Sequence, residues 1–437
     1  MLANSPQLPL VIGHLDEYDA ITTDDEDGII LALQHRDRVR RIRLRIPIPN
    51  LRKLIIALDG EFPILEFLSI SYSTSTDTQD MSLNIPGAFR APDLRHLFLM
   101  SFAIPIEFPL FTTMGNLVNL NLDLIPPSAY FHPNAFLRRI LLMPQLEILG
   151  IFFSSDCPSG DVETQLLSSA ITASVTPPNL GGFGFQGASA YLEALLPWVN
   201  FPLLEKLQVY FSYQLTYSIP HLQQFMITAR NFRPIATTLD FYEDYLRMSA
   251  YPREGARVYT LAIALDGSHL DWQVASPAQF FHAIETVFLA VEHLTLQYDR
   301  RPISSERDDE ADRIQWRELF RTFRVVKELS VEMELVGQIS RFLQSDEGES
   351  PTELLPELQE LSYYSTDASN DSFAPFIEAR EKAGRPVNVI NLPANDGSTV
   401  GAQSSDLLRA QFLARFHLSH YRTPQSMRMS HCQTFPS

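Results

Sequence analysis

Cysteine is almost absent from this sequence of 437 residues, which has only Cys157 and Cys432. Two cysteines are too few for the disulfide framework of a small secreted domain or for a cysteine-based zinc site. Basic residues are also scarce, because 34 Lys and Arg stand against 52 Asp and Glu, a net charge of −18. Such a charge disfavours non-specific attraction to nucleic acid and anionic lipid, so we expect neither as a partner.

Long apolar runs are missing as well. No stretch approaches the roughly 20 uninterrupted apolar residues of a membrane-spanning helix. The first 20 residues lack the basic region and the long apolar core of a secretory signal. We therefore expect a soluble protein of the cytoplasm or nucleus, without a membrane partner.

Catalytic motifs are also lacking. The sequence has no Gly-x-Ser-x-Gly elbow, no His-Glu-x-x-His helix and no phosphate-cradling loop. Residues 182–187 have the Gly-x-Gly-x-x-Gly spacing of a dinucleotide fingerprint, but Phe183 and Phe185 fit the strand positions of a repeat. We expect no cofactor and no enzymatic activity.

Two candidate metal sites fail on their residues. The acidic stretch 23–34 resembles a calcium loop, but Thr23 and Gln34 stand where that loop requires Asp and Glu. Acidic residues before a helix are explained more simply by the helix dipole. Three histidines and Cys432 gather near the C-terminus, in a segment that we expect to be flexible, whereas metal ligands must be fixed by structure. We expect no metal site.

A repeat is what the sequence does contain. FPILEFLSI at 62–70 returns as FPLLEKLQV at 201–209. Their common core, Leu-x-x-Leu-x-apolar, recurs in APDLRHLFL at 91–99, MPQLEILGI at 143–151 and LPELQELSY at 355–363. In Leu-x-Leu the two leucines point to one side of a strand, and each unit can bury that side only against its neighbours. The pattern predicts a stack of strands.

The spacing of the copies predicts what lies between the strands. The second leucine position of successive copies is 22 residues apart at the closest, from 239 to 261, and 35 at the farthest, from 294 to 329. Leucine-rich repeats run about 20–29 residues, so these gaps leave room for a helix in most units. The predicted fold class is α/β: an irregular leucine-rich-repeat solenoid with parallel strands on the concave face and helices and loops on the convex face.

The predicted organisation has three parts. Residues 1–30 form an N-terminal partial repeat with an exposed apolar end, residues 31–395 form the solenoid, and residues 396–437 form a mostly flexible tail. Many leucine-rich repeats carry Asn or Cys three residues after the last strand leucine, but this chain has Ser73 and Phe102 at two such positions. Without an asparagine ladder we expect the repeats to be irregular.

A family resemblance accompanies the repeat. DGIILALQHRDRVRRIRLRIP, then LRKLIIALDGEFPILEFLSI and FAPFIEAREKAGRPVNV, resemble the leucine-rich region of F-box-like proteins of mushroom-forming fungi over about residues 8–392. The resemblance implies a substrate receptor of a cullin-based ubiquitin ligase. In that family an F-box helical module precedes this region and docks on the ligase adaptor. No such module is recognisable here, so we expect the adaptor as a partner only if an upstream F-box exists.

Residues that flank the inward leucines should face a ligand on the concave side. Aromatic, Met and amide side chains on such a surface are typical of protein interfaces. The candidate protein-binding residues are Phe67, Phe98, Met100, Asn121, Phe152, Tyr210, Gln297 and Tyr364.

Arginines gather in RDRVRRIRLRI at 36–46, where alternation directs Arg41, Arg43 and Arg45 outward. Such a row is either a solvated strand face or a local contact for an acidic or phosphorylated ligand.

Two functions follow from the sequence. The first is a protein-binding leucine-rich-repeat module, the substrate-recognition part of an F-box-type receptor that lacks its F-box here. The alternative is a non-catalytic structural or regulatory scaffold without a ubiquitin ligase role. Neither identifies the bound protein.

Overall fold

The computed structural model describes residues 8–14, 21–72, 83–154, 174–211, 218–229, 232–242, 245–253, 260–266, 278–298, 310–344, 353–365 and 372–393. The chain divides into two compact units, residues 1–395 and 396–437. The predicted tail, 396–437, lies outside the described residues. The first unit carries the whole of the fold that follows.

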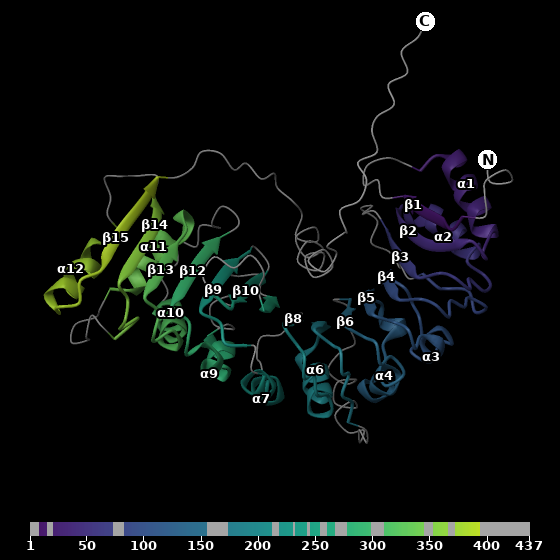
Figure 1. Cartoon of the computed structure of the whole chain (residues 1–437). Coiled ribbons are helices and arrows are strands. Elements are labelled where there is room, and N and C mark those ends of the chain that lie inside the picture. The colour runs from purple at the N-terminus through teal and green to yellow at the C-terminus, as the bar shows by residue number, and fades with distance from the viewer. Residues whose placement is uncertain are drawn as a thin grey trace, which may run out of the picture. The chain divides into compact units, whose positions relative to one another are not determined.

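Strands of the described residues join into one open sheet of fifteen, in the order β1 to β8, then β11, β10, β9, and then β12 to β15 (Figure 1). All neighbours are parallel except β10, which is antiparallel to β9 and β11. The strands are β1 (Leu10–His14), β2 (Val39–Ile46), β3 (Phe67–Tyr72), β4 (His96–Met100), β5 (Asn119–Ile125), β6 (Ile148–Phe153), β7 (Gly182–Gly187), β8 (Lys206–Phe211), β9 (Ala236–Phe241), β10 (Tyr245–Tyr251), β11 (Leu261–Asp266), β12 (His293–Tyr298), β13 (Glu328–Val331), β14 (Glu360–Ser365) and β15 (Asn388–Pro393).

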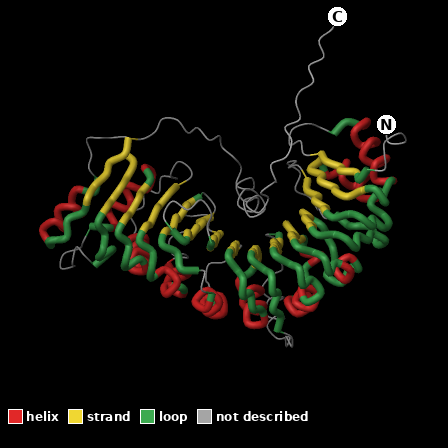
Figure 2. Tube along the Cα trace, in the orientation of Figure 1, coloured by secondary structure: helices red, strands yellow, loops and turns green. Residues whose placement is uncertain are grey.

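Helices lie on one side of the strands, in a second layer with the loops (Figure 2). They connect most pairs of successive parallel strands, since a parallel crossover needs a connection that returns the chain to the same end of the sheet. They are α1 (Thr23–Gln34), α2 (Ile48–Ile56), α3 (Leu110–Thr113), α4 (Pro133–Ile140), α6 (Ser189–Leu195), α7 (Pro220–Thr228), α9 (Glu285–Phe288), α10 (Glu310–Thr322), α11 (Met333–Phe342) and α12 (Ala374–Lys382), with short 3₁₀ turns at Pro127–Ala129 and Leu196–Trp198.

The repeat leucines form the core between the two layers. Leu97 and Leu99 of β4 lie in register with Leu120 and Leu122 of β5, and each of the four side chains is at most 6% exposed. Leu94, three positions before Leu97, is completely buried in the turn that leads into β4. Burying one such side chain stabilises the fold by roughly 1.5–3 kcal/mol, so the regular pattern is sufficient to define the buried side of the sheet.

A main-chain ladder links successive units at the start of their strands. The carbonyl oxygen of Glu66 accepts the amides of Arg95 and His96, at 2.9 and 3.0 Å. The carbonyl of Arg95 in turn accepts the amides of Val118 and Asn119, at 2.8 and 3.0 Å. Because these bonds use only backbone groups, neighbouring units are held together without an asparagine ladder.

The mixed α/β class and the mostly parallel sheet built from the leucine repeats confirm the coarse prediction. The prediction was wrong at β9–β11. Copies around Leu239 and Leu261 were interpreted as successive parallel repeats, but β9, β10 and β11 form an antiparallel meander inserted in reverse order. The missed strand β10 has no Leu-x-x-Leu anchor, and Leu246, Met248 and Ala250 provide its buried side instead.

Candidate functional site

The side of the sheet opposite the leucine core is the candidate site, and we call it the open face. Its residues alternate along each strand with the core leucines. Across β3, β4 and β5 the open face has Phe67, His96 and Asn119 in one register row, and Ser69, Phe98 and Asn121 in the next. Each row therefore crosses the sheet at right angles to the strands.

The structure places the predicted residues on the open face with very different exposures. Met100, Phe98 and Gln297 are half-buried. Phe67 is 7% exposed, and the remaining side chains described, those of Asn121, Phe152 and Tyr210, are at most 1% exposed. Tyr364 lies in β14, but its side chain is outside the described part of the chain. Alternation thus placed these residues on the side opposite the leucines, but it did not predict how exposed each side chain is.

Asn121 and Phe152 come together over Gly150. A Cβ atom built on Gly150 would lie 2.7 Å from Asn121 Nδ2 and 2.7 Å from Phe152 Cε2. The missing side chain therefore makes the space into which the amide and the ring pack. Asn121 in β5 and Phe152 in β6 therefore meet across neighbouring strands, one repeat unit apart in sequence.

Two charged groups are buried on the central part of the open face. Burial raises the pKa of Asp123 to about 7, although its Oδ1 accepts the Leu124 amide at 2.9 Å. Burial also lowers the pKa of Lys206 on β8 to about 8. The side chains of Asp123 and Lys206 are only 3% and 5% exposed, which is the cause of both shifts.

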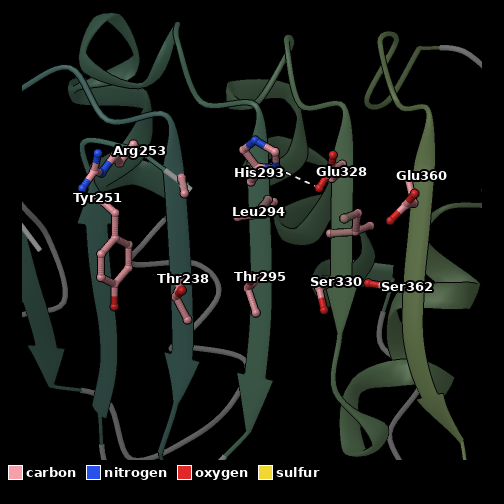
Figure 3. A pocket seen from close by; sticks show the side chains of 12 residues that line it. Thr238, Tyr251, Arg253, His293, Leu294, Thr295, Glu328, Ser330, Glu360 and Ser362 are labelled. Atoms are coloured by element: carbon pink, nitrogen blue, oxygen red, sulfur yellow. Dashed lines mark hydrogen bonds and ion pairs between the residues drawn. The ribbon is translucent and has the colours of Figure 1, made fainter. Parts of the chain in front are cut away.

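A shallow pocket occupies the open face of β9, β12, β13 and β14 (Figure 3). Its volume is about 280 Å³. Its floor is a row of hydroxyl side chains that lie in register on neighbouring strands. We call this row the hydroxyl trough; it consists of Thr238, Thr295, Ser330 and Ser362.

Charged groups form one rim of the trough. His293, Glu328 and Glu360 occupy the register row beside it, and His293 Nδ1 lies 2.8 Å from Glu328 Oε2. Tyr251 and Arg253 line the pocket at its β10 end, away from Glu360 (Figure 3). The pocket is therefore acidic at the β13–β14 end and basic at the β10 end.

A buried ion pair joins β9 and β10 next to the pocket. Arg247 Nη2 lies 2.7 Å from Asp240 Oδ2, and its Nε donates to the same oxygen at 2.8 Å. Burial alone would lower the pKa of Arg247, but the carboxylate of Asp240 raises it overall. Asp240 and Arg247 are also register partners in the antiparallel pairing of β9 with β10.

The arginine row of β2 lies at the other end of the sheet. Arg41 and Arg43 are exposed on the open face, and the guanidinium of Arg41 lies 4.7 Å from the ring centre of Phe67. Arg45 follows two positions later and is half-buried. This arrangement is compatible with both interpretations of the row, a solvated strand face and a contact for an acidic ligand.

The pocket residues were mostly missed by the sequence analysis. Thr295, Ser330 and Ser362 are the middle residues of Leu-x-Leu or Leu-x-apolar, so the repeat pattern already places them on the open face. The predicted binding residues were aromatic, Met and amide side chains, and these hydroxyl residues belong to none of those types. The signal was the succession of three hydroxyl residues at the same repeat position.

Other motifs have ordinary structural roles. Residues 182–187 form β7, paired on both sides, with Phe183 and Phe185 completely buried, so Gly182 and Gly184 lie within a strand. Residues 23–34 form helix α1, and Thr22 accepts the Asp25 amide at its N-terminus. Among the described residues, no group of three or more His, Cys, Asp or Glu could hold a metal ion. None of the described helices is both long and apolar enough to cross a membrane.

The fold belongs to a recognisable class, since one strand per leucine repeat and a layer of helices and loops define the leucine-rich-repeat type of α/β protein. The sequence matches no protein-family model and no curated protein. Among solved structures, the chain is similar to the leucine-rich repeat-containing protein LegL7 from Legionella pneumophila, with 11% identity and a TM-score of 0.29. The match covers 76% of this chain and 92% of that chain.

Proposed function

We propose that this chain is a non-enzymatic protein-binding module of the cytoplasm or nucleus that receives a partner protein on its open face. The observation that supports the proposal most directly is the open face itself. Its exposed and half-buried side chains lie on β2–β4, on β9 and on β12–β14, among them Phe98, Met100 and the hydroxyl trough, whereas the described side chains of β5–β8 on this face are buried. Parallel repeat arrays commonly use such extended sheet faces for binding.

The finer form of the proposal is a substrate receptor of an F-box-type ubiquitin ligase. It rests on the family resemblance of the sequence. One observation favours the alternative, a structural or regulatory scaffold: Phe67, Phe152 and Tyr210 are at most 7% exposed, so the aromatic part of the predicted surface is small.

Affinity purification from cell extract tests both the protein-binding proposal and the finer proposal of a ubiquitin ligase receptor. The bait is the full chain, compared with Phe98→Glu on the open face and with Ile56→Glu on α2, whose side chain is 73% exposed. A partner retained by the wild type and by Ile56→Glu, but lost with Phe98→Glu, supports binding through the open face. A partner that is retained by both variants contradicts binding through the open face. For the finer proposal, the half-life of that partner should lengthen when the chain is depleted. An unchanged half-life contradicts the ligase role and supports the alternative, a structural or regulatory scaffold.

A further inference from the structure

We infer that the hydroxyl trough and its acidic rim bind a basic side chain, Lys or Arg, of an extended segment of the partner protein. The inference rests on the proposed function, because it names the chemistry recognised at one part of the open face. It concerns the β13–β14 end of the pocket, where Glu328 and Glu360 stand beside Ser330 and Ser362 (Figure 3).

Two carboxylates stand side by side on the rim of the pocket. Glu328 and Glu360 are register partners on adjacent strands, whose backbones lie about 4.8 Å apart. Like charges directly opposite each other destabilise a sheet. His293 lies against Glu328, and Asn388 Nδ2 donates a long hydrogen bond to Glu360, at 3.4 Å. A cation bound in the pocket would balance the charge of these two neighbouring carboxylates.

The floor of the pocket offers hydrogen-bond acceptors to a cation. Ser330 and Ser362 lie one register row from Leu329 and Leu361, on the opposite side of the strands, and each hydroxyl offers two acceptor lone pairs. An ammonium group has three protons to donate and a guanidinium has five, so carboxylates and hydroxyls together can satisfy either group. Their small side chains also leave the space of the pocket, about 280 Å³.

The size of the trough suits a short extended segment. The row from Thr238 to Ser362 crosses four neighbouring strands, which is about 14 Å at 4.8 Å per interval. Four extended residues span about 13 Å. Arg253 at the β10 end reverses the charge, so the basic side chain belongs at the β13–β14 end.

A metal ion fits the site less well than an organic cation. Among the described residues, His293, Glu328 and Glu360 do not form a group that could hold a metal. The acceptors are instead spread along two register rows. That arrangement matches a side chain whose donors point in several directions.

The inference can be tested with a phage-displayed library of random heptapeptides, selected against the full chain. We expect Lys or Arg to be enriched in the selected peptides. Synthetic copies should bind at least tenfold more weakly to Glu328→Gln/Glu360→Gln, as expected when charge-assisted hydrogen bonds are lost. Glu61→Gln/Glu147→Gln is the matched control, because it removes two exposed carboxylates outside the pocket and should bind as the wild type does.

Three results would overturn the inference. One is enrichment of peptides without basic residues, the second is equal binding by the wild type and the pocket variant, and the third is no enrichment over the starting library. The affinity purification with Phe98→Glu decides the proposed function separately. A partner lost with Phe98→Glu but retained by the pocket variant would leave open-face binding in place without the basic side-chain contact.

Discussion

Arg380 of α12 is completely buried, and it connects this helix to the turn before β14. Its guanidinium donates to the carbonyl oxygens of Leu355 at 3.2 Å, Pro356 at 3.4 Å and Leu358 at 3.2 Å. Burial lowers its pKa. The same turn contains Leu355 at φ +50°, a left-handed conformation that costs energy for a residue with a side chain. Three donated hydrogen bonds hold the turn in that conformation.

Replacing Arg380 by Met should therefore destabilise the protein by about 3 kcal/mol, because buried carbonyls lose their donors. Urea unfolding followed by circular dichroism measures the change. Lys382→Met is the control on the same helix, since the Lys382 side chain is 80% exposed and its ion pair with Glu378 is on the surface. Equal stability of both variants would show that the turn does not depend on Arg380.

Asp123 predicts a dependence of stability on pH. Its folded-state pKa is about 7, compared with an ordinary value of 3.8, because the carboxylate is buried. The folded state therefore binds a proton more tightly than the unfolded state. Its contribution to stability is fully present below about pH 4 and is lost as the pH rises through 7.

Asp123→Asn should be more stable than the wild type at pH 8, by up to about 4 kcal/mol from a shift of roughly three pKa units. At pH 4 the two proteins should be equally stable, because Asp123 is then neutral in the folded state. Chemical unfolding at both pH values measures the difference between them. The exposed Asp93→Asn should change stability little at either pH, and a constant advantage of Asp123→Asn across the range would contradict the argument.

At the scale of a strand, β6 depends on the absence of a side chain. Gly150→Ala would bring a Cβ to 2.7 Å from both Asn121 Nδ2 and Phe152 Cε2, so the amide and the ring must move. We expect destabilisation by about 1–3 kcal/mol, the usual range for overpacking. Thermal unfolding measures it.

Gly337→Ala in α11 is the matched control. Nothing lies within 4 Å of a Cβ at this position, and alanine is favoured over glycine in a helix by up to about 1 kcal/mol. The two substitutions add the same methyl group and should change stability in opposite directions. A stabilising effect at Gly150 would show that the packing over β6 is loose.

The elements also show how much could be predicted from the sequence. The strands that carry Leu-x-Leu were predictable, because side-chain periodicity alone defines the buried side, as for Leu97 and Leu99 in β4. Strand β10 was not, because Met248 and Ala250 fill core positions without the repeat signature. The main-chain ladder from Glu66 to His96 was also beyond prediction, since backbone bonds leave no mark on residue type.

The candidate site was predictable only as a face. Alternation places Phe98 and Phe152 on the same side of the sheet, yet Phe98 is half-buried and Phe152 is completely buried. The ring of Phe152 packs over Gly150, two residues earlier in β6, beside Asn121 of β5. Exposure on this face therefore depends on the sizes of the neighbouring side chains in the same and in adjacent strands, which alternation alone does not specify.

For the first unit as a whole, the meander β9–β11 connects the two sets of parallel strands, β1–β8 and β12–β15. Within the described sheet, strands β1–β8 reach strands β12–β15 only through β11, β10 and β9. The ion pair of Asp240 with Arg247 lies inside this connection, with side-chain exposures of 7% and 15%. Repeat arrays gain stability from contacts between neighbours, so a weakened link should let the two sets of strands unfold separately.

Asp240→Ala tests this coupling, because it leaves the guanidinium of Arg247 buried without its carboxylate, at a cost of about 3–5 kcal/mol. Trp198, after α6, and Trp316, in α10, report on the two sides of the meander. With Trp272 and one of the other two tryptophans replaced by Phe, each protein keeps either Trp198 or Trp316 as its single fluorophore. When Asp240 is present, the urea unfolding transitions reported by Trp198 and by Trp316 should coincide. In Asp240→Ala the Trp198 and Trp316 transitions should separate.

The control for that experiment is Glu292→Ala, which removes an exposed ion pair with Lys327. An exposed pair contributes at most about 1 kcal/mol, so the two tryptophan transitions should stay coincident. If they stay coincident in Asp240→Ala as well, with both shifted to lower urea, the ion pair stabilises the sheet without coupling its two sides. Separation only in Asp240→Ala would identify the antiparallel meander as the element that makes fifteen strands unfold as one.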